Sequence, residues 1–507
     1  MGVFSVSEKI TQKELESYLK GATTLLRGLI DASDYKQYIF PLLFYKRLCD
    51  VWDEDYSLAF SKTNDIDFAT STANDRFLIP SEYSWRNLRN STKNLGQLLV
   101  RGFREIETKN DERLSGIFGN ASWTDKEQMP DVILKNLIEH FSSIKLDIST
   151  VPEDELGNGY EYLIKHFADD SGNTAQEFYT NRTLVHLMAQ MLKPQTGESI
   201  YDPTCGTGGM LISALSEVKR LGGDVRTIGL FGQELINITA AIAKMNLVLH
   251  GVSDFEIKNG NTLHKPLLIQ DDQLRKFDIV LANPPYSIKT WNQEAWSSDQ
   301  WGRNFLGTPP QGRADYAFFQ HILKSLKSDT GRCAILFSHG VLFRKEEAEL
   351  RRKLVESDVL ECVLGLGPNL FYNSPMEACV VICRFNKSEN QKGKVLFIDA
   401  VNEYEKQSSQ TYLSPVNQSR ILQAYEQFQD ISLFAKVSDI SEILANNGNL
   451  TIHHYVDRGD KVFSNDSEIS VTDLWLRNEK EFGHLNLNID SFMLKSKQNN
   501  GGGDNIS

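Results

Sequence analysis

The 507-residue chain lacks an excess of positive charge. Its 54 lysines and arginines are outnumbered by 67 aspartates and glutamates, which gives a formal net charge of −13 and a pI of about 5.4. Proteins bind nucleic acid largely by neutralising phosphates, so this composition excludes a protein that holds DNA through its overall charge. Either basic residues gather on one face, or another subunit supplies most contacts to DNA. Charge alone equally fits an enzyme that acts on a protein.

Other absences argue against a zinc protein and against a membrane or secreted protein. The sequence has no signal-peptide charge pattern and no apolar run of about 18 residues, so we expect no membrane contact and a location in the reducing cytoplasm. No CxxC pair is present, and no metal site is predicted. Cys379 and Cys383 flank an apolar triplet and are expected to pack in a buried strand. The six cysteines are Cys49, Cys205, Cys333, Cys362, Cys379 and Cys383.

The first 150 residues predict a helical domain. Segment 11–14 has the form of a capping box, and Leu15, Leu19, Ala22 and Leu26 follow it at helical spacing. Strand signals are few in this region. Such a domain either contacts a partner or DNA, or serves only to brace the rest of the chain.

Residues 151–405 predict an α/β domain, because apolar strand segments alternate with helical ones. That alternation implies right-handed crossovers and a doubly wound, mainly parallel sheet. A helical C-terminal extension is predicted for 406–495 and a flexible tail for 496–507. The expected strands lie near residues 200, 230, 255–257, 279, 334–337, 360–366, 380–382 and 395–398, and the expected helices span 183–192, 210–221, 238–249, 316–326, 419–428 and 438–445.

The segment Asn283-Pro284-Pro285-Tyr286 directly follows the apolar run 277–282. The Asn283 side-chain oxygen and the Pro284 carbonyl can both accept hydrogen bonds from one amino group on a flat ring, and Tyr286 offers a face for stacking. Two acceptors draw the nitrogen away from conjugation with the ring. Pro285 fixes its own φ and biases Pro284 towards an extended conformation. We interpret the segment as an amino-group site; the alternative is a strand end followed by a proline-rich turn.

A glycine turn after another strand predicts a nucleoside-containing cofactor. Segment 199–209 predicts a strand that ends in Gly206-Thr207-Gly208-Gly209, where the backbone can approach a ligand closely. The spacing departs from G-x-G-x-x-G, which disfavours NAD and FAD. Glu234 ends the next predicted strand, about 25 residues beyond the glycines, and suits two hydrogen bonds to ribose hydroxyls. A solvent-facing acid is the alternative for Glu234. With the amino-group site, the pattern indicates S-adenosylmethionine.

The chain resembles the amino-group DNA methyltransferases, and specifically the modification (M) subunit of type I restriction-modification systems. The resemblance covers roughly residues 10–457, and the order of its motifs is more specific than any one of them. The segments that carry it are 154–163, 177–182 (Glu-Phe-Tyr-Thr-Asn-Arg), 202–209, 283–286 and 307–318.

This resemblance implies a Rossmann-like S-adenosylmethionine-dependent methyltransferase domain that modifies N6 of adenine in DNA. Asn283, Pro284, Pro285 and Tyr286 would hold the target adenine. The implied cofactor residues are Glu177, Phe178, Tyr179, Thr180, Asn181 and Arg182 at the methionine end, Thr207, Gly208 and Gly209 beneath it, Asp202 as a strand-end acid, and Glu234 at the ribose.

Two positions depart from the family pattern. Asn181 stands where the family usually has proline, although asparagine can still start the next helix as an N-cap. Asn261 stands where aspartate is common. It keeps an acceptor for the adenine amino group of the cofactor but loses the charge.

The resemblance also implies partners. These are double-stranded DNA, a separate specificity (S) subunit that carries the target-recognition domains, a restriction (R) subunit, and a second copy of this chain in the same complex. Three alternatives stay open: a self-sufficient adenine-N6 methyltransferase, a protein glutamine methyltransferase and a non-enzymatic assembly subunit. Glutamine methyltransferases share Asn-Pro-Pro-Tyr but resemble this chain neither in length nor in the Phe-Tyr-Thr segment, and intact motif residues argue against an assembly subunit.

Two further segments allow two interpretations each. Segment 291–319, rich in tryptophan and arginine, is either a lid or surface for a flipped base, or a loop anchored by its aromatic residues. Segment 344–353 mixes basic residues (Arg344, Lys345, Arg351, Arg352, Lys353) with glutamates, which most simply predicts a solvated helix face, with a DNA phosphate contact as the alternative.

Overall fold

The computed structural model describes residues 9–458, apart from residues 29, 32–33, 171–179, 287, 371–376 and 408–409. The tail predicted for 496–507 therefore lies outside the described residues, as do Glu177, Phe178 and Tyr179.

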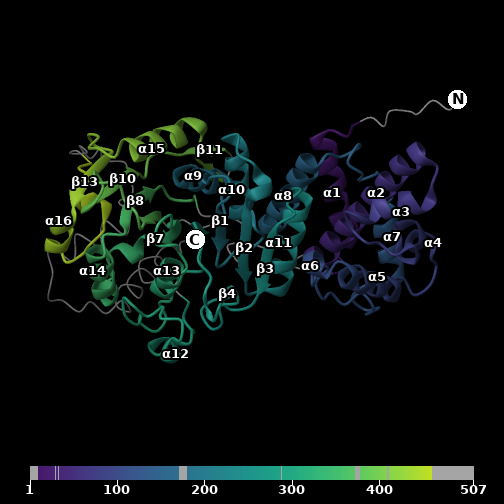
Figure 1. The fold of residues 1–507 in the computed structure, drawn as a ribbon, viewed down its shortest axis with the longest axis horizontal. Helices are drawn as coiled ribbons and strands as arrows, with labels where there is room; N and C mark the ends of the chain where they lie inside the picture. Colours follow the sequence, from purple (N-terminus) through teal and green to yellow (C-terminus); the bar gives the residue numbers. More distant parts are fainter. Residues whose placement is uncertain are drawn as a thin grey trace, which may run out of the picture. The chain divides into compact units, whose positions relative to one another are not determined.

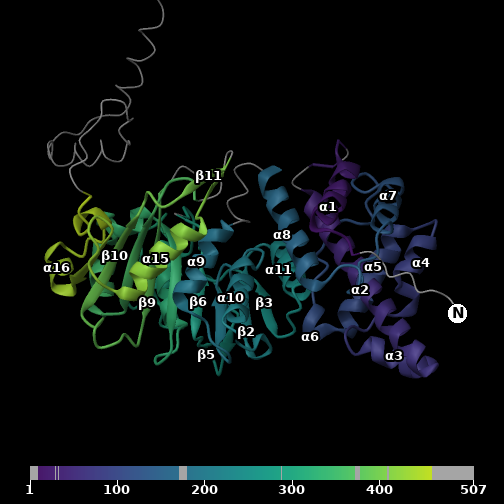
Figure 2. The ribbon, with the colours of Figure 1, turned by 90° about the horizontal axis from the view of Figure 1, so that it is seen from above.

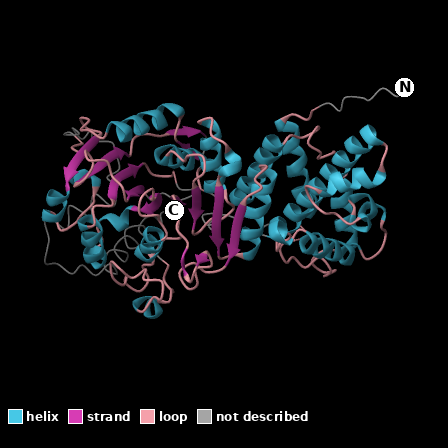
Figure 3. Cartoon of the chain, viewed as in Figure 1, coloured by secondary structure: helices cyan, strands magenta, loops and turns pink. Residues whose placement is uncertain are grey.

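The described part of the first 150 residues is helical, as predicted, and a further helix follows it up to residue 170 (Figures 1 and 3). Thr11 is the N-cap of the first helix, and its capping box with Glu14 is formed. The apolar positions Leu15, Leu19, Ala22 and Leu26 are all buried in one core. The helices are α1 (Gln12–Leu26), α2 (Tyr35–Thr63), α3 (Ile66–Asn74), α4 (Trp85–Asn90), α5 (Leu95–Lys109), α6 (Asp111–Leu114), α7 (Asp131–Phe141) and α8 (Glu153–Asp170).

Helix α8 joins the helical region to the rest of the chain. It packs against α1 on one side and against α11 (Asn237–Leu249) on the other (Figure 2). Tyr160 of α8 is fully buried, and its hydroxyl donates to the sulfur of Met245 at 3.3 Å. Residues of α11 thus belong to the helical core, which fixes α8 at the edge of the following domain.

A nine-stranded sheet forms the centre of that domain, in the order β13-β10-β8-β9-β7-β6-β1-β2-β3. Its strands are β1 (Ser199–Asp202), β2 (Gly229–Glu234), β3 (Phe255–Asn259), β6 (Ile279–Ala282), β7 (Arg332–Ser338), β8 (Leu360–Leu366), β9 (Ala378–Arg384), β10 (Lys394–Ala400) and β13 (Ala435–Asp439). Two short hairpins, β4 (Ile269–Gln270) with β5 (Gln273–Leu274) and β11 (Glu405–Gln407) with β12 (Gln410–Tyr412), lie outside it.

The predicted doubly wound, mainly parallel sheet is confirmed. Pairings from β3 through β2, β1 and β6 to β7 are parallel, as is the β8–β10 pair. Strand β9 runs antiparallel to both neighbours, and β13 is antiparallel to β10. From β1 the chain proceeds to β2 and β3 on one side, whereas β6 and β7 lie on the other. The carboxyl ends of β1 and β6 therefore flank a topological switch point, where such sheets bind ligands.

Helices cover both faces of this sheet (Figure 1). Along β7, Ala334 and Leu336 point into one apolar core, while Cys333, Ile335 and Phe337 point into the other. That alternation, with both faces buried, is typical of a doubly wound sheet. The remaining helices are α9 (Arg182–Leu192), α10 (Gly209–Arg220), α12 (Gln293–Ser297), α13 (Asp315–Lys324), α14 (Ala348–Glu356), α15 (Pro415–Gln427) and α16 (Ile440–Ala445).

Two sequence predictions need correction. The helix predicted for 438–445 begins only at Ile440, because the residues before it form β13 and extend the main sheet. The solvated helix face predicted for 344–353 is wrong for Arg351 and Glu347, which are both buried. Arg351 donates to the carbonyls of Gly448 and Arg344 at 2.9 and 3.0 Å. Its guanidinium therefore holds two backbone segments together inside the protein and does not face solvent.

Candidate functional site

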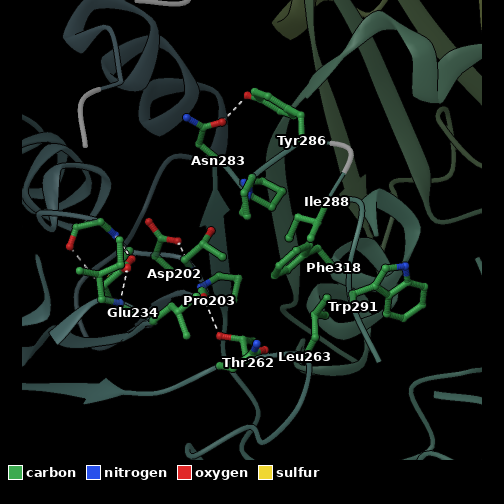
Figure 4. Close-up of a pocket in the computed structure, with 18 of the residues that line it drawn as sticks. Asp202, Pro203, Glu234, Thr262, Leu263, Asn283, Tyr286, Ile288, Trp291 and Phe318 are labelled. Atoms are coloured by element: carbon green, nitrogen blue, oxygen red, sulfur yellow. Dashed lines mark hydrogen bonds between the residues drawn. The ribbon is translucent and has the colours of Figure 1, made fainter. Parts of the chain in front are cut away.

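A pocket of about 1180 Å³ opens at the switch point, at the carboxyl ends of β1, β2 and β6 (Figure 4). Both sequence motifs reach it: the glycine turn follows β1, and Asn283 follows β6. One cavity therefore brings together segments about 80 residues apart in the chain.

The glycine turn forms one wall. Gly208 has φ of +81° and is the N-cap of α10, a conformation that favours glycine. The turn is held to the neighbouring strand, since the Cys205 amide donates to the Gln233 carbonyl at 3.0 Å. Thr207 and Gly209 line the pocket. Gly208 supports the turn without lining the cavity.

Glu234 stands at the end of β2 and lines the same wall. One carboxylate oxygen accepts from the Gly206 amide at 3.0 Å, and the other accepts from the Ile236 amide at 2.9 Å. These bonds fix the acid at the pocket rather than in open solvent. Its assignment to a ribose stays a prediction.

Asp202 lies at the bottom of the wall and is almost fully buried. Its carboxylate accepts from the Thr204 amide at 3.0 Å. Burial raises the pKa of Asp202 to about 8, and the nearby charge of Glu234 adds to the shift. The group is therefore largely protonated at neutral pH in this state.

The two asparagines that depart from the family pattern have different surroundings. Asn181 is the N-cap of α9, as predicted: its side-chain oxygen accepts from the Thr183 amide at 3.1 Å. It lies beside the pocket and does not line it, whereas Thr180 and Arg182 do. Asn261 lines the pocket, and its side-chain oxygen accepts from the His264 amide at 3.0 Å. A cofactor contact by either residue stays a prediction.

The segment 283–286 forms the opposite wall, and all four residues line the pocket. The Asn283 side-chain nitrogen donates to the Thr180 hydroxyl at 3.0 Å, and the Tyr286 hydroxyl donates to the Asn283 side-chain oxygen (Figure 4). Burial raises the pKa of the Tyr286 phenol well above its usual value. The ring packs partly against both apolar cores of the sheet. This wall thus places a hydrogen-bond acceptor, the side-chain oxygen of Asn283, beside the aromatic ring of Tyr286.

Known protein families match both the helical region and the sheet domain of the chain. The N-6 DNA Methylase family matches residues 151–462, and the HsdM N-terminal domain family matches residues 15–141. A type I restriction enzyme methylase subunit of Methanocaldococcus jannaschii, MjaVIII, is 31% identical over 477 residues, which cover 89% of this chain and 79% of that protein. The HindI methylase subunit of Haemophilus influenzae is 29% identical, covering 71% of this chain and 83% of its own.

A solved structure agrees with these relatives. The type I restriction-modification methyltransferase subunit from Streptococcus thermophilus superposes with a TM-score of 0.77 at 30% identity, covering 88% of this chain and all of that one. The chain belongs to the N-6 DNA methylase family. It is a methyltransferase subunit of the type I restriction-modification group, and the predicted fold, family and adenine-specific enzyme class are confirmed.

Several lining residues of this methylase were not singled out from the sequence. They include apolar side chains on the wall between the two motifs, two of which directly follow Glu234. Leu235 and Ile236 directly follow Glu234 at a strand end, and Leu263 comes two residues after Asn261. Inspection of the residues that follow each predicted strand would therefore have found all three. Ser338, the last residue of β7, would have been found in the same way, whereas Ile288 has no such signal; Phe318 and Arg344, which the sequence placed in a family segment and on a helix face, line the pocket as well.

In this methylase, the described part of segment 291–319 is mainly an anchored loop. The buried guanidinium of Arg303 lies over the rings of Trp296 and Trp301, at 4.5 and 5.0 Å from their centroids. It also pairs with Asp299 at 2.7 Å. Trp291 is the one tryptophan of the three that lines the pocket, and Gln311, Arg313 and Phe318 line it from the other end of the segment, so the surface interpretation is retained for both ends of the loop.

The described residues contain neither a membrane-spanning helix nor a metal-binding cluster. No helix there is long and apolar enough to span a membrane. In that same part of the chain, no group of three or more histidine, cysteine or acidic side chains is arranged to hold a metal ion.

Proposed function

We propose that this methylase transfers the methyl group of S-adenosylmethionine to N6 of an adenine in a specific DNA sequence. The observation that carries the proposal is the placement of Asn283 and Glu234 on opposite walls of one pocket. An acceptor pair suited to an amino group thus faces an acid suited to a ribose. No comparable reason favours a glutamine side chain, which has no ring to stack on Tyr286.

The residues of the first wall fit the cofactor. In the turn 206–209, three glycines let the backbone approach closely, Glu234 is fixed by two backbone amides, and Leu235 and Leu263 offer apolar surface. Arg182 and Thr180 line the pocket near the start of α10, where an amino-acid carboxylate would find donors. When bound, S-adenosylmethionine supplies an electrophilic methyl group.

The residues of the second wall act on the base. Asn283 and the Pro284 carbonyl accept the two amino protons of the adenine, which orients the N6 lone pair towards the cofactor side. Tyr286 stacks on the flipped ring and holds it against that wall. These residues carry the rate by positioning and polarisation.

The Tyr286 hydroxyl donates to the Asn283 side-chain oxygen and uses one of its two lone pairs. The second lone pair is left for an amino proton of the adenine. The hydrogen bond to Thr180 can persist, because it uses the amide nitrogen.

The proposal includes partners. A chain with a net charge of −13 has too little positive charge to neutralise many DNA phosphates. Recognition of the DNA sequence and much of the affinity for DNA therefore come from a separate specificity subunit. Two copies of this chain with one specificity subunit would modify one adenine on each strand of double-stranded DNA. A restriction subunit completes the system, and the enzyme works in the cytoplasm.

Transfer of tritium from labelled S-adenosylmethionine to DNA tests this function. We expect little transfer by the chain alone and strong transfer once the specificity subunit is added, with label in N6-methyladenine. The same complex carrying Asn283→Ala is the matched control and should transfer about 10³-fold less label. Robust, sequence-specific methylation by the isolated chain would instead identify a self-sufficient methyltransferase.

A further inference from the structure

The helix that joins the helical region to the sheet sends one charged side chain towards the pocket. Glu161 lies on α8, and its carboxylate pairs with the guanidinium of Arg182, with the Nε–Oε2 distance at 2.5 Å. Arg182 is the first residue of α9 and lines the pocket, whereas Glu161 does not. Both side chains are largely buried, with 17% of Glu161 and 26% of Arg182 exposed. Arg182 therefore forms part of the cavity wall, and Glu161 lies behind it.

The second carboxylate oxygen of Glu161 holds the glycine turn. It accepts from the side-chain nitrogen of Asn246 at 2.6 Å, and the same nitrogen donates to the carbonyl of Thr207 at 2.9 Å. Asn246 is fully buried on α11. One carboxylate thus fixes both the guanidinium and the turn that forms the first wall.

Gly209 explains why the turn ends in two glycines. A Cβ atom at Gly209 would lie 1.7 Å from an Arg182 guanidinium nitrogen. Unlike Gly208, Gly209 has no positive φ, so its backbone conformation does not require glycine. The residue is small because the guanidinium lies directly over the first turn of α10.

The position of this guanidinium is unfavourable without a counter-charge. The N-terminus of a helix carries a partial positive charge, which repels a cation. The Glu161 carboxylate offsets that repulsion and keeps the guanidinium over the helix start. Arginine and free helix amides together make a strong site for a carboxylate.

The fold makes this arrangement rigid. Helix α8 is packed closely on α1, since a Cβ at Gly159 would lie 2.9 to 3.0 Å from the side chains of Leu19 and Leu15. Gly157 is similarly close to the ring of His250, at 2.7 Å for the nearest atom. Glu161 is thus carried by a helix held on two sides.

We propose that Glu161 is a positioning residue that holds Arg182 over the start of α10, where the guanidinium binds the methionine carboxylate of the cofactor. The inference rests on the proposed use of S-adenosylmethionine. It gives segment 154–163 a role in cofactor binding, although no residue of that segment lines the pocket.

Two ligands separate this role from a merely structural one. S-adenosylhomocysteine carries the amino-acid tail, and 5′-methylthioadenosine has the same adenosine without that tail. Calorimetry on the full chain with Glu161→Gln should show affinity for S-adenosylhomocysteine lowered about tenfold, with affinity for 5′-methylthioadenosine within about twofold of the unchanged chain. Glutamine can keep its oxygen towards Asn246, but its amide nitrogen then faces Arg182, so this variant removes both the charge pair and the hydrogen bond that hold the guanidinium while sparing the glycine turn.

Two further variants keep the test decisive if Glu161→Gln unfolds. Arg182→Gln removes the cation, and Gly209→Ala displaces it while leaving both charges in place. Each should reproduce the selective loss, and Glu161→Gln combined with Arg182→Gln should lose little more than either alone. Glu198→Gln, which breaks the similarly buried Glu198–Arg332 pair before β1, is the matched control and should change neither affinity.

The outcomes are distinguishable. Equal losses for both ligands, or no loss for either, would overturn the role of Glu161 while leaving the cofactor in place. Failure of the unchanged chain to bind either ligand would overturn the proposed cofactor, and this role with it.

Discussion

The two walls of the pocket are held together by different parts of the chain. On the first wall, backbone groups make most of the fixed bonds: the amides of Gly206 and Ile236 hold Glu234, and the Pro203 carbonyl accepts from Thr262 at 2.6 Å. On the second wall, side chains bind one another, with Asn283 between Thr180 and Tyr286.

This difference teaches which kind of group each ligand meets. Backbone bonds within a sheet and its turns are already made, so the first wall is formed before a cofactor arrives. On the second wall, the groups that would hold the base are side chains, and Asn283 is held by the two side chains to which it is bonded. We therefore expect variants of the second wall to affect transfer without affecting cofactor binding, and variants of the first wall to do the reverse.

The largest expected effect separates the walls completely. Asn283→Ala removes the side-chain acceptor for the adenine amino group and should lower methyl transfer by about 10³-fold, the upper end for one hydrogen-bonding group. Cofactor affinity, measured by calorimetry, should stay nearly unchanged. Tritium transfer by the complex with the specificity subunit measures the rate.

Asn283→Asp is the informative companion to that variant. Aspartate keeps an acceptor oxygen at the same position, so measurable transfer should return. A large loss of cofactor affinity in Asn283→Ala would mean that the two walls are not independent.

The reverse effect is expected at Glu234. Glu234→Ala removes the charged acceptor proposed for the ribose and should weaken S-adenosylmethionine binding by about 2–3 kcal/mol, roughly 30- to 150-fold. Glu256→Ala, on the adjacent strand and paired with Lys258 at 2.8 Å, is the control and should bind normally. Unchanged affinity in Glu234→Ala would remove this acid from the cofactor site.

Tyr286 tests whether its ring or its hydroxyl matters on the second wall. Tyr286→Phe keeps the stacking face and also frees the Asn283 oxygen, so transfer should stay within about threefold of the unchanged enzyme. Tyr286→Ala should lose about 1–3 kcal/mol of stacking. Tritium transfer and calorimetry on both variants measure this, and equal losses of transfer would contradict the stacking role.

Local chemistry made parts of the fold and site predictable from sequence. Thr11 and Asn181 cap helices as expected, because capping depends on residues within the same turn. The two motifs were placed at strand ends, and parallel strands bring their carboxyl ends to one edge. Their meeting in one pocket followed from that geometry.

Features set by distant contacts were not predictable. Apolar segments such as 380–382 indicate a buried strand but carry no sign of its direction, and β9 proved antiparallel. Strand β13 is only partly buried, so its pattern predicts no strand, and the helix predicted for 438–445 overlaps its last two residues. The burial of Arg351 depends on the Gly448 carbonyl, 97 residues away, which no helical period reveals.

The smallest expected effect concerns pH and the first wall. Burial raises the pKa of Asp202 to about 8 in the folded chain, well above the usual carboxyl value near 3.8. Without ligand, this group favours the folded state at low pH, and the contribution is lost as the pH rises through 8. A cationic ligand stabilises the charged carboxylate, so binding below pH 8 should release a proton. Affinity for S-adenosylmethionine should therefore rise with pH up to about 8, by at most tenfold per pH unit, and then level off.

A comparison of two ligands isolates this effect. S-adenosylhomocysteine has the same amino-acid tail and the same adenosine but lacks the sulfonium charge. The sulfonium also lowers the pKa of the amino group in the tail, so each ligand is compared between the unchanged enzyme and Asp202→Asn. Calorimetry from pH 6 to 9 should show that Asp202→Asn reduces the pH slope for S-adenosylmethionine more than the slope for S-adenosylhomocysteine. If the variant leaves both slopes unchanged, Asp202 does not sense the sulfonium, and its burial serves only to hold the Thr204 amide at the turn.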